Sequence, residues 1–425
     1  MRFRMRFWPQ EAHKRLLLKN TFFLYLLRFS SYFFGFIAIM IQTRVLGSLM
    51  YGKVGVANAL MVYFQLLIDF GFILSATQDI AQKAEDREEV SRIYSAVQWA
   101  KIFLVALSFL ILGGILLFFP SYRQDAAFYL LFLLGTAING FIPDFVYRGL
   151  QQMAPVTFRT VLAKGIFTVL IFVFLRRPED YMVVPLLSIC GNGVALIWSI
   201  HYLHRSFQIR LRRVSWKDFA ANFKLSSGFF ISRIAGTAYS SFNVLLVRSF
   251  TPQLSGIYAA GDKLLTTGQN ALTPISDSIY PYMVSHRDFK LIYKVLRIFM
   301  PIIGLACLIG FVYAEGICKL IFGPDFARTG PILRGLIPAA FVTLPDFLFG
   351  FPCMSALGIA RHANYSIYVS SSFHICAVAI LYFCGVLSPF LLACMVSLTT
   401  CLECLYRVLV VLYYTRRKKP GELQT

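Results

Sequence analysis

Three basic side chains lie within long apolar stretches of the sequence: Arg28, Arg233 and Lys263. A charged side chain near the centre of a bilayer costs about 2.5–3.5 kcal/mol on insertion scales, so it faces a protein interior, pairs with another group, or extends to the headgroups. Arg28 and Arg233 are 205 residues apart, at matching places in the first and seventh apolar stretches. This repetition favours two cations that line a water-filled cleft, and extension of Arg28 to the cytoplasmic headgroups is the alternative.

Four aspartates in or beside apolar stretches are candidates for binding a coupling ion: Asp69, Asp262, Asp144 and Asp346. Asp69 has no basic neighbour on its own predicted helix, and a buried carboxyl of this kind either finds a partner or binds a proton. Glu403, deep in the last apolar stretch, is similar. Asp262 adjoins Lys263, but sequence neighbours do not face each other on a helix. An ion pair with other helices and a role in a site are therefore both open for this pair.

The other candidates lie at the ends of apolar stretches. Asp144 and Asp346 each follow a proline, which favours a helix-breaking turn with a capping carboxylate over a coupling role. Arg44 and Arg248 lie at the outer ends of the first and seventh stretches. Anchoring at the membrane interface and contact with an anionic substrate at the outer mouth are the two interpretations of these arginines.

The histidines and cysteines predict no metal site, no catalytic residue and no cofactor. Cys401 and Cys404 form a C-x-x-C pair, but no second pair and no histidine at zinc spacing follows. His374 stands alone in an apolar stretch, and we interpret it as structural.

The composition identifies the environment in which these residues must act. Of the 425 residues, 58% are hydrophobic and 14% are charged, whereas soluble proteins carry about 25% charged residues. A water-soluble enzyme, a disordered chain and a disulfide-stapled secreted domain are therefore excluded. The net charge of +21 is typical of a nucleic-acid-binding protein only in a soluble chain. In a membrane protein it reflects the retention of Lys and Arg in cytoplasmic loops, so we expect no nucleic-acid partner.

About twelve stretches reach the roughly 20 apolar residues that a helix needs to cross a bilayer. They lie near residues 20–43, 54–77, 97–119, 126–147, 156–175, 181–203, 225–248, 255–283, 292–314, 330–357, 363–385 and 388–413. The sequence thus predicts an all-α polytopic membrane protein. We expect a six-helix lobe over 1–204, a cytoplasmic linker over 205–224, and a second six-helix lobe over 225–425 that ends in a basic cytoplasmic tail.

The basic residues also predict the orientation of the chain. Lys and Arg favour the side that holds both termini and the central linker by about three to one, which places this side in the cytoplasm. The predicted loops on the other side are short, and no segment is long enough for a catalytic domain outside the membrane. The function must therefore lie among the helices, and we do not expect an enzyme.

The two halves resemble each other. Arg44 to Gly52 matches Arg248 to Gly256 at an offset of 204, and the Pro-Asp-Phe sequence at 143–145 recurs at 345–347, at an offset of 202. Because each half has an even number of predicted spans, both halves cross the membrane in the same direction. Transporters built from such parallel repeats place the substrate between the lobes and alternate its access to the two sides. A central cleft is therefore expected.

Several segments resemble those of the Wzx-type O-antigen and polysaccharide flippases, which belong to the multidrug/oligosaccharidyl-lipid/polysaccharide exporter superfamily. The segments that carry the resemblance are Leu26-Leu-Arg28, Thr43-Arg-Val-Leu-Gly47 with Tyr51-Gly52, the run from Tyr63 to Thr77, Pro143 to Met153, Tyr258-Ala-Ala-Gly-Asp-Lys263, Thr273-Pro-Ile-Ser276, and Tyr280-Pro281. The chain departs from the family pattern at Phe145, where the family usually has Trp, and at Asp262, where it usually has Glu. The resemblance implies two six-helix bundles around a cationic cleft in the bacterial inner membrane.

The resemblance also implies a substrate, a polyprenyl-pyrophosphate-linked oligosaccharide that moves from the cytoplasmic to the outer leaflet. Arginine pairs with phosphate through planar, often bidentate hydrogen bonds, so Arg28 and Arg233 are suited to hold the pyrophosphate while the polyprenyl chain stays in lipid. The sequence has no nucleotide-binding motif, which leaves an ion gradient as the energy source. The implied partners are a polysaccharide polymerase and a chain-length regulator. A drug or metabolite antiporter and a membrane glycan polymerase or ligase are the alternative functions.

Overall fold

The computed structural model describes residues 10–212, 214, 223–224, 226–227, 230 and 241–417. This part of the chain is helical and contains no strand. Nine of its helical stretches are long and apolar enough to cross a membrane, so the protein is an integral membrane protein. One of them, Phe22–Gln82, covers two of the predicted spans. The predicted total of twelve spans stays a prediction.

The helices belong to two compact units. Unit 1 is formed by the described residues of Met1–Ala38, Met61–Arg176 and Met182–Arg233, and unit 2 by those of Ile39–Leu60, Arg177–Tyr181 and Ile234–Thr425. The long α1 (Gln10–Asp69) contributes to both units. Its helical course is interrupted at Gly47, whose φ of 66° is left-handed and therefore suits glycine.

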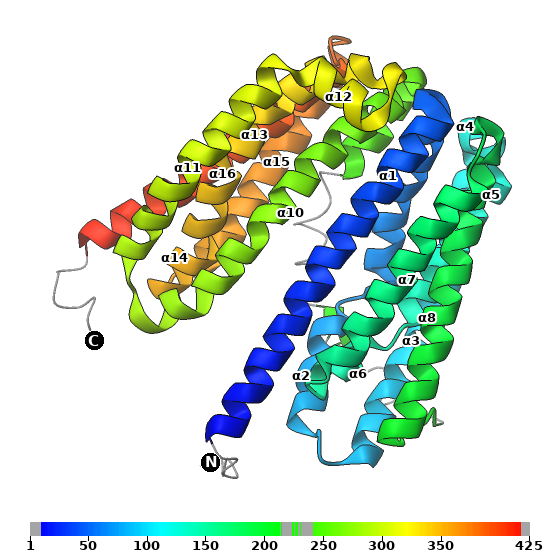
Figure 1. The fold of residues 1–425 in the computed structure, drawn as a ribbon, viewed down its shortest axis with the longest axis vertical. Helices are drawn as coiled ribbons and strands as arrows, with labels where there is room; N and C mark the ends of the chain where they lie inside the picture. Colours follow the sequence, from blue (N-terminus) through cyan, green and yellow to red (C-terminus); the bar gives the residue numbers. More distant parts are fainter. Residues whose placement is uncertain are drawn as a thin grey trace. The chain divides into compact units, whose positions relative to one another are not determined.

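Unit 1 is a bundle in which α5 and α7 both pack on α8, α3 packs on α5, and α2 packs on α6 (Figure 1). After α1, its helices are α2 (Phe72–Gln82), α3 (Arg87–Phe118), α4 (Pro120–Arg123), α5 (Ala126–Phe141), α6 (Asp144–Gly149), α7 (Met153–Phe174) and α8 (Val183–Phe207). The short 3-10 helix η1 (Pro178–Met182) precedes α8. Proline at 143 cannot donate to the preceding turn, and the chain breaks there between α5 and α6.

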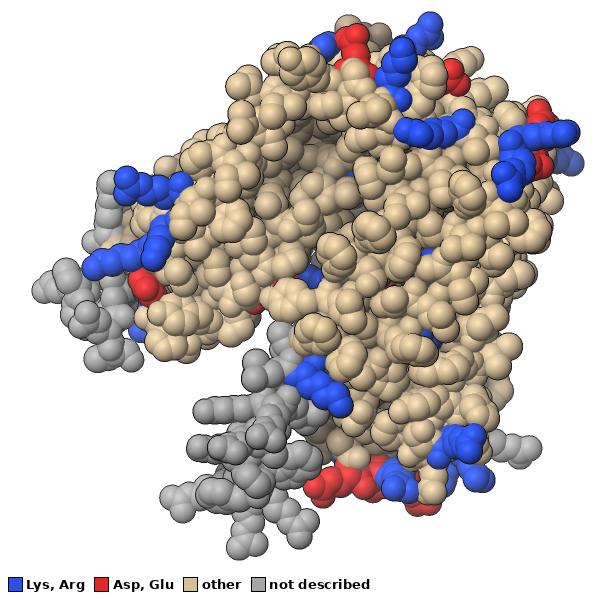
Figure 2. Space-filling view, viewed as in Figure 1, with Lys and Arg blue, Asp and Glu red and all other residues tan. Residues whose placement is uncertain are grey.

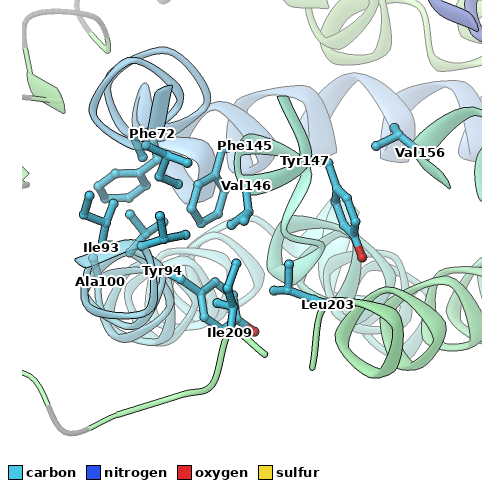
Figure 3. Close-up of a cluster of buried hydrophobic side chains, with 14 of the residues drawn as sticks. Phe72, Ile93, Tyr94, Ala100, Phe145, Val146, Tyr147, Val156, Leu203 and Ile209 are labelled. Carbon is cyan, nitrogen blue, oxygen red and sulfur yellow. The ribbon is translucent and has the colours of Figure 1, made fainter. Parts of the chain in front are cut away.

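The core of unit 1 lies where α2, α3 and α6 meet (Figure 3). The rings of Phe72, Tyr94 and Phe145 are each 2% exposed or less. Tyr147 is also buried, and its hydroxyl, red in Figure 3, donates to the backbone oxygen of Ser199 on α8 at 2.7 Å. This apolar cluster fixes the short α6 against α3 and α8, and α6 carries one of the candidate aspartates at its first residue.

Unit 2 is organised around α13, which packs against α10, α11, α12 and α16 (Figure 1). Its helices are Ser241–Phe250, η2 (Pro252–Leu254), α10 (Ser255–His286), α11 (Phe289–Val312), α12 (Ala314–Phe322), η3 (Pro324–Arg328), α13 (Thr329–Phe349), α14 (Phe351–Ala356), α15 (Arg361–Phe383) and α16 (Pro389–Arg417). Leu344, Leu348 and Met354 form its core with Met283 of α10.

The repeated Arg-to-Gly segments of the two halves meet inside unit 2. A Cβ atom added to Gly256 of α10 would lie 1.9 Å from the Ser48 backbone oxygen and 2.8 Å from the Gly52 backbone nitrogen. A Cβ atom added to Gly52 would in turn lie 2.7 Å from the Ser255 hydroxyl oxygen. Both helices therefore need glycine where they cross, since a side chain would displace backbone atoms.

The surfaces of the helices match a lipid environment. In each unit, most of the Lys, Arg, Asp and Glu visible in Figure 2 lie toward the helix ends, and the stretches between show only small spots of charge. The most apolar segment of α11 has no buried residue. Its Ile302, Leu305 and Leu308 are each 60% exposed. Such exposure is costly in water but not in a hydrocarbon core.

Candidate functional site

A buried ion pair connects α6 and α7 of unit 1. The Arg159 guanidinium donates to Asp144 Oδ1 at 2.8 Å and to the Ser199 hydroxyl at 2.7 Å. The Arg159 side chain is 6% exposed and that of Asp144 is 30% exposed. Charge-assisted hydrogen bonds of this kind are stronger than neutral ones. They hold α6, α7 and α8 together at one level of the bundle.

A second buried cation lies on α3. The Lys101 ammonium donates to the Gly140 backbone oxygen and lies 5.4 Å from the centroid of the Phe145 ring. Gly140 of α5 packs closely against Ile68 of α1. A Cβ atom added to Gly140 would lie 2.5 Å from Ile68 Cγ2, so this position has no room for a side chain. The close approach of α5 to α1 leaves the Gly140 carbonyl available to the lysine.

Asp69 belongs to a short chain of polar contacts near this lysine. Gln65 donates from its side-chain nitrogen to Asp69 Oδ1 at 3.1 Å, and Asn139 donates to Gln65 at 3.2 Å. We refer to these polar groups together as the unit 1 polar cluster, which is made of Gln65, Asp69, Lys101, Asn139, Asp144, Arg159 and Ser199. Its charged members are two cations and two carboxylates, so its charges balance.

In unit 2, one arginine binds two carboxylates. Arg407 of α16 donates to Asp346 Oδ2 of α13 at 2.7 Å, and also to Glu403 Oε1 one turn earlier on its own helix. Its Nε atom donates to the Ser366 hydroxyl of α15 at 2.9 Å. The three charged side chains are 7%, 9% and 8% exposed. We name Asp346, Glu403 and Arg407 the unit 2 triad.

A cavity adjoins the unit 2 triad. It has a volume of about 440 Å³, and the residues that line it are Thr273, Ser276, Asp277, Tyr280, Phe347, Phe351, Pro352 and Arg407. Among the described residues of this lining, Arg407 is the one cation. Ser276 donates to the Phe347 backbone oxygen at 3.3 Å, which connects α10 to α13 beside the cavity.

His374 lies in a separate polar contact of unit 2. Its ring is fully buried, with Nδ1 2.9 Å from the Thr399 hydroxyl and Nε2 3.0 Å from Asn243 Oδ1. It therefore connects α15 to α16 and to the helix Ser241–Phe250. In the part of the chain that the structure describes, no group of three or more His, Cys, Asp or Glu side chains is placed to hold a metal ion.

The structure brings only some of the predicted residues together. Arg28 is half-buried on α1, and Arg248 is half-buried in unit 2. Arg233 lies outside the described residues, so its predicted pairing with Arg28 across a cleft stays a prediction. On α10, Lys263 is exposed and Asp262 half-buried.

Arg44 has a clear structural role. Its guanidinium donates to the backbone oxygens of Leu320 and Ile321, with 3.2 Å to the latter. These carbonyls belong to the last turn of α12 (Ala314–Phe322), where backbone oxygens lack helical partners and attract cations. Arg44 thereby joins the end of α12 to α1, just before the interruption at Gly47.

Sequence reasoning missed three cations. The charge pattern of the sequence places Lys101, Arg159 and Arg407 with the cytoplasmic charges, but each of these residues is 6% exposed or less and lies inside its bundle. One signal was available in the sequence: Glu403 and Arg407 are four residues apart, a spacing that brings side chains together on a helix. Arg159 and Asp144 lie on different helices, and no periodicity connects them.

These features define a polytopic, all-helical membrane protein with buried charge clusters inside its bundles and no domain outside them in the described part. The sequence profile of the family "Polysaccharide biosynthesis protein" matches residues 17–286. The chain belongs to this family.

Two relatives agree with this assignment. A "Putative O-antigen transporter" of Escherichia coli (strain K12) is 25% identical over 354 residues, which cover 81% of this chain and 85% of that protein. A protein of the same description from Shigella dysenteriae is 26% identical over 330 residues, covering 76% and 82%.

Two solved structures share the fold. An inward-facing multidrug resistance MATE family transporter of the MOP superfamily has a TM-score of 0.72 at 12% identity, covering 92% of this chain and 96% of that one. The lipid II flippase MurJ, in an inward closed conformation, has a TM-score of 0.68 at 11% identity, covering 96% and 89%. At these identities the likeness concerns the fold alone.

Proposed function

We propose that this protein is a flippase that moves a polyprenyl-pyrophosphate-linked oligosaccharide, an O-antigen or other surface polysaccharide repeat unit, from the cytoplasmic to the outer leaflet. The observation that carries this proposal is the relationship to proteins described as O-antigen transporters over 81% of the chain. The shared fold with a lipid II flippase supports it, because that protein moves another lipid across a membrane. The substrate changes leaflet and no bond is broken, so the protein is not an enzyme.

The cations named from the sequence are our candidates for substrate contact. Arg28 and Arg233 are proposed to bind the pyrophosphate, because a guanidinium offers paired donors that fit phosphate oxygens. Lys263 and Arg248 are secondary candidates. Arg44 is the weakest, since its guanidinium is occupied by the end of α12.

The carboxylates are our candidates for coupling transport to an ion gradient. Asp69 and Asp144 belong to the unit 1 polar cluster, Asp346 belongs to the unit 2 triad, and Asp262 lies on α10 between these features in the sequence. Protonation or ion binding at such a carboxyl changes the charge that the bundle must bury. It can therefore favour one conformation over another.

The membrane arrangement is part of the proposal. We place the protein in the bacterial inner membrane with both termini in the cytoplasm, because Lys and Arg are concentrated on that side. We further propose lobes over 1–204 and 225–425 joined by a cytoplasmic linker over 205–224. A polysaccharide polymerase and a chain-length regulator would use the flipped product on the outer side.

The test is a transport measurement with a defined lipid. Purified protein is reconstituted into vesicles with a fluorescent polyprenyl-pyrophosphate oligosaccharide, and a membrane-impermeant quencher reports how much label reaches the other leaflet. We expect protein-dependent movement of this lipid and none of a labelled phosphatidylcholine. Transport of a cationic drug in place of the lipid-linked sugar would favour the antiporter alternative and contradict the proposal.

A further inference from the structure

The charges of the unit 2 triad do not balance. Arg407 supplies one positive charge, while Asp346 and Glu403 supply two negative charges if both are ionised. All three side chains are less than 10% exposed and lie in helices that cross the membrane. An uncompensated charge in such a place is strongly disfavoured, and a titratable group there is neutralised by taking up a proton.

None of the described groups around the triad supplies the missing positive charge. Ser366 and Ser370 of α15 contribute neutral hydroxyls, and Cys404 of α16 contributes a buried thiol. On the α10 side, the cavity lining adds Asp277 and Tyr280, which are an acid and a phenol. Among these described neighbours, each titratable group is neutral or negative.

The hydrogen bonds indicate where the proton is held. Both carboxylate oxygens of Glu403 accept hydrogen bonds, Oε1 from Arg407 and Oε2 from Ser370 at 2.9 Å. Asp346 Oδ2 accepts from Arg407, but Asp346 Oδ1 is buried and has no hydrogen-bond partner. An ionised oxygen without a donor is costly to bury. A proton on Asp346 removes the uncompensated charge, and a neutral carboxyl oxygen without a donor is less costly to bury than an ionised one.

We propose that the unit 2 triad is a proton-binding site that holds one exchangeable proton, on Asp346, at neutral pH. The proton comes from and returns to water in the cavity lined by Arg407, Asp277 and Tyr280, since Phe347, next to Asp346, lines that cavity too. This inference deepens the proposed function, on which its role in transport rests, by selecting one coupling site and the proton as the coupling ion.

The equivalent position of unit 1 provides an internal comparison. Asp144 occupies the same place in its Pro-Asp-Phe sequence as Asp346. It pairs one-to-one with Arg159, and no second carboxylate accepts from that arginine in the described structure. A balanced pair has no excess negative charge. One lobe thus carries a salt bridge where the other carries a proton site.

The direct test reads the protonated carboxyl in the purified full-length protein. Infrared difference spectra recorded between acidic and alkaline pH, in H₂O and D₂O, distinguish the carbonyl stretch of a buried carboxylic acid from that of a carboxylate. We expect one protonated buried carboxyl per chain at neutral pH, lost on alkaline titration. No substrate is needed, so the result is independent of whether the protein flips a lipid-linked sugar.

Two substitutions test whether the unit 2 triad holds the proton. Asp346→Asn and Glu403→Gln each leave Arg407 with one carboxylate, so each makes the cluster electrically balanced and keeps a partner for the arginine. Both variants should fold, and both should lose the protonated-carboxyl band completely. The matched control is Asp144→Asn, which alters the repeated position in unit 1 and should keep the band at full intensity.

The same variants test coupling in vesicles. We expect an imposed pH gradient to accelerate wild-type transport of the lipid-linked sugar and to have no effect on Asp346→Asn or Glu403→Gln. The proposal is overturned if the wild-type band is absent, if it survives both substitutions, or if sodium ions displace it at constant pH. A band with the expected behaviour in a protein that moves no lipid-linked sugar would overturn the proposed function and leave the proton site standing.

Discussion

Arg159 and Arg407 bind aspartates that hold the same position in a repeated Pro-Asp-Phe sequence, but the two arginines come from different helices of their units. Arg159 lies on α7 and contacts a serine on α8, whereas Arg407 lies on α16 and contacts a serine on α15. The arginine and the serine have thus exchanged helices between the two halves. Both bundles thus have an arginine bound to the aspartate of the Pro-Asp-Phe sequence, but the helix that supplies the arginine differs.

This exchange explains why the contact was invisible to a search for repeats. Arg159 and Ser366 are 207 residues apart, and Ser199 and Arg407 are 208 apart, so the equivalent positions carry different residue types. Only the aspartates repeat. On α16, the exchange also places Arg407 one turn after Glu403, which creates the second carboxylate contact that unit 1 lacks.

The first prediction concerns the stability of the unit 1 pair. Arg159→Ala leaves Asp144 without its cation and should lower the thermal midpoint of the detergent-solubilised protein. Breaking a fully buried pair costs about 3–5 kcal/mol, and the cost here should be smaller because Asp144 is 30% exposed. The double variant Arg159→Met with Asp144→Asn should recover part of the loss, since no charge is then left unpaired.

The matched control for this pair is Arg92→Ala. Arg92 is 51% exposed and lies 3.1 Å from Glu89, and exposed pairs contribute about 0–1 kcal/mol. Its midpoint should stay near that of the wild type. Equal losses in Arg92→Ala and Arg159→Ala would contradict the assignment of a buried, structural ion pair.

The second prediction concerns the glycine crossing between α1 and α10. Gly256→Ala would place a Cβ atom 1.9 Å from the Ser48 backbone oxygen, and a backbone atom cannot rotate away. Overpacking of a close contact costs about 1–3 kcal/mol and sometimes more, so we expect a lower thermal midpoint and less folded protein in the membrane. Gly268→Ala is the control on the same helix, because nothing lies within 4 Å of a Cβ atom there. If the two variants have the same midpoint, the helices do not cross as described.

The sequence predicted much of the architecture because apolar composition and length are decisive in a bilayer. A stretch of apolar residues without charge has few alternatives to a membrane helix, and the all-helical fold of a membrane protein followed from that pattern. The family followed instead from the resemblance of particular segments, such as Tyr63 to Thr77. The repeat was detectable for the same reason that Gly52 and Gly256 are present: a close backbone contact accepts no other residue type.

The candidate site was predicted less well because burial of a charge depends on tertiary contacts. Lys101 lies near the start of an apolar stretch and has the same local pattern as a residue that extends to the headgroups. Its acceptor, the Gly140 carbonyl, is 39 residues away and comes from another helix. The four-residue spacing of Glu403 and Arg407 was readable, but Asp346 joins them only through the packing of α13 on α16.

The third prediction concerns the proposed pyrophosphate contact. Hydrogen bonds to charged groups contribute about 1.5–3 kcal/mol, so Arg28→Ala should slow transport of the lipid-linked sugar in vesicles by roughly ten- to a hundredfold. Arg28→Lys keeps the charge but loses the paired donors, so its transport rate should lie between those of the wild type and Arg28→Ala. The thermal midpoint of each variant and an Arg92→Ala control separate transport from folding. Wild-type transport by Arg28→Ala would remove this residue from the substrate site.

The fourth prediction separates His374 from the proposed proton site. The buried imidazole contacts both Thr399 and Asn243. His374→Ala should leave the Asn243 side-chain oxygen without this partner, at about 1–3 kcal/mol, whereas the Thr399 hydroxyl keeps its hydrogen bond to the Met395 backbone oxygen. We expect a clear fall in the thermal midpoint. His374→Gln, which can still reach one partner, should fall less.

Neither histidine variant should alter the titration of the protonated carboxyl, because the triad on α13 and α16 keeps its own two carboxylates and one guanidinium. The measurement is the infrared band of the His374→Gln protein compared with that of Glu403→Gln at matched pH. If the histidine substitution removes the band and the glutamate substitution leaves it, the proton is bound near His374, and the excess charge at Asp346 must be compensated in some other way.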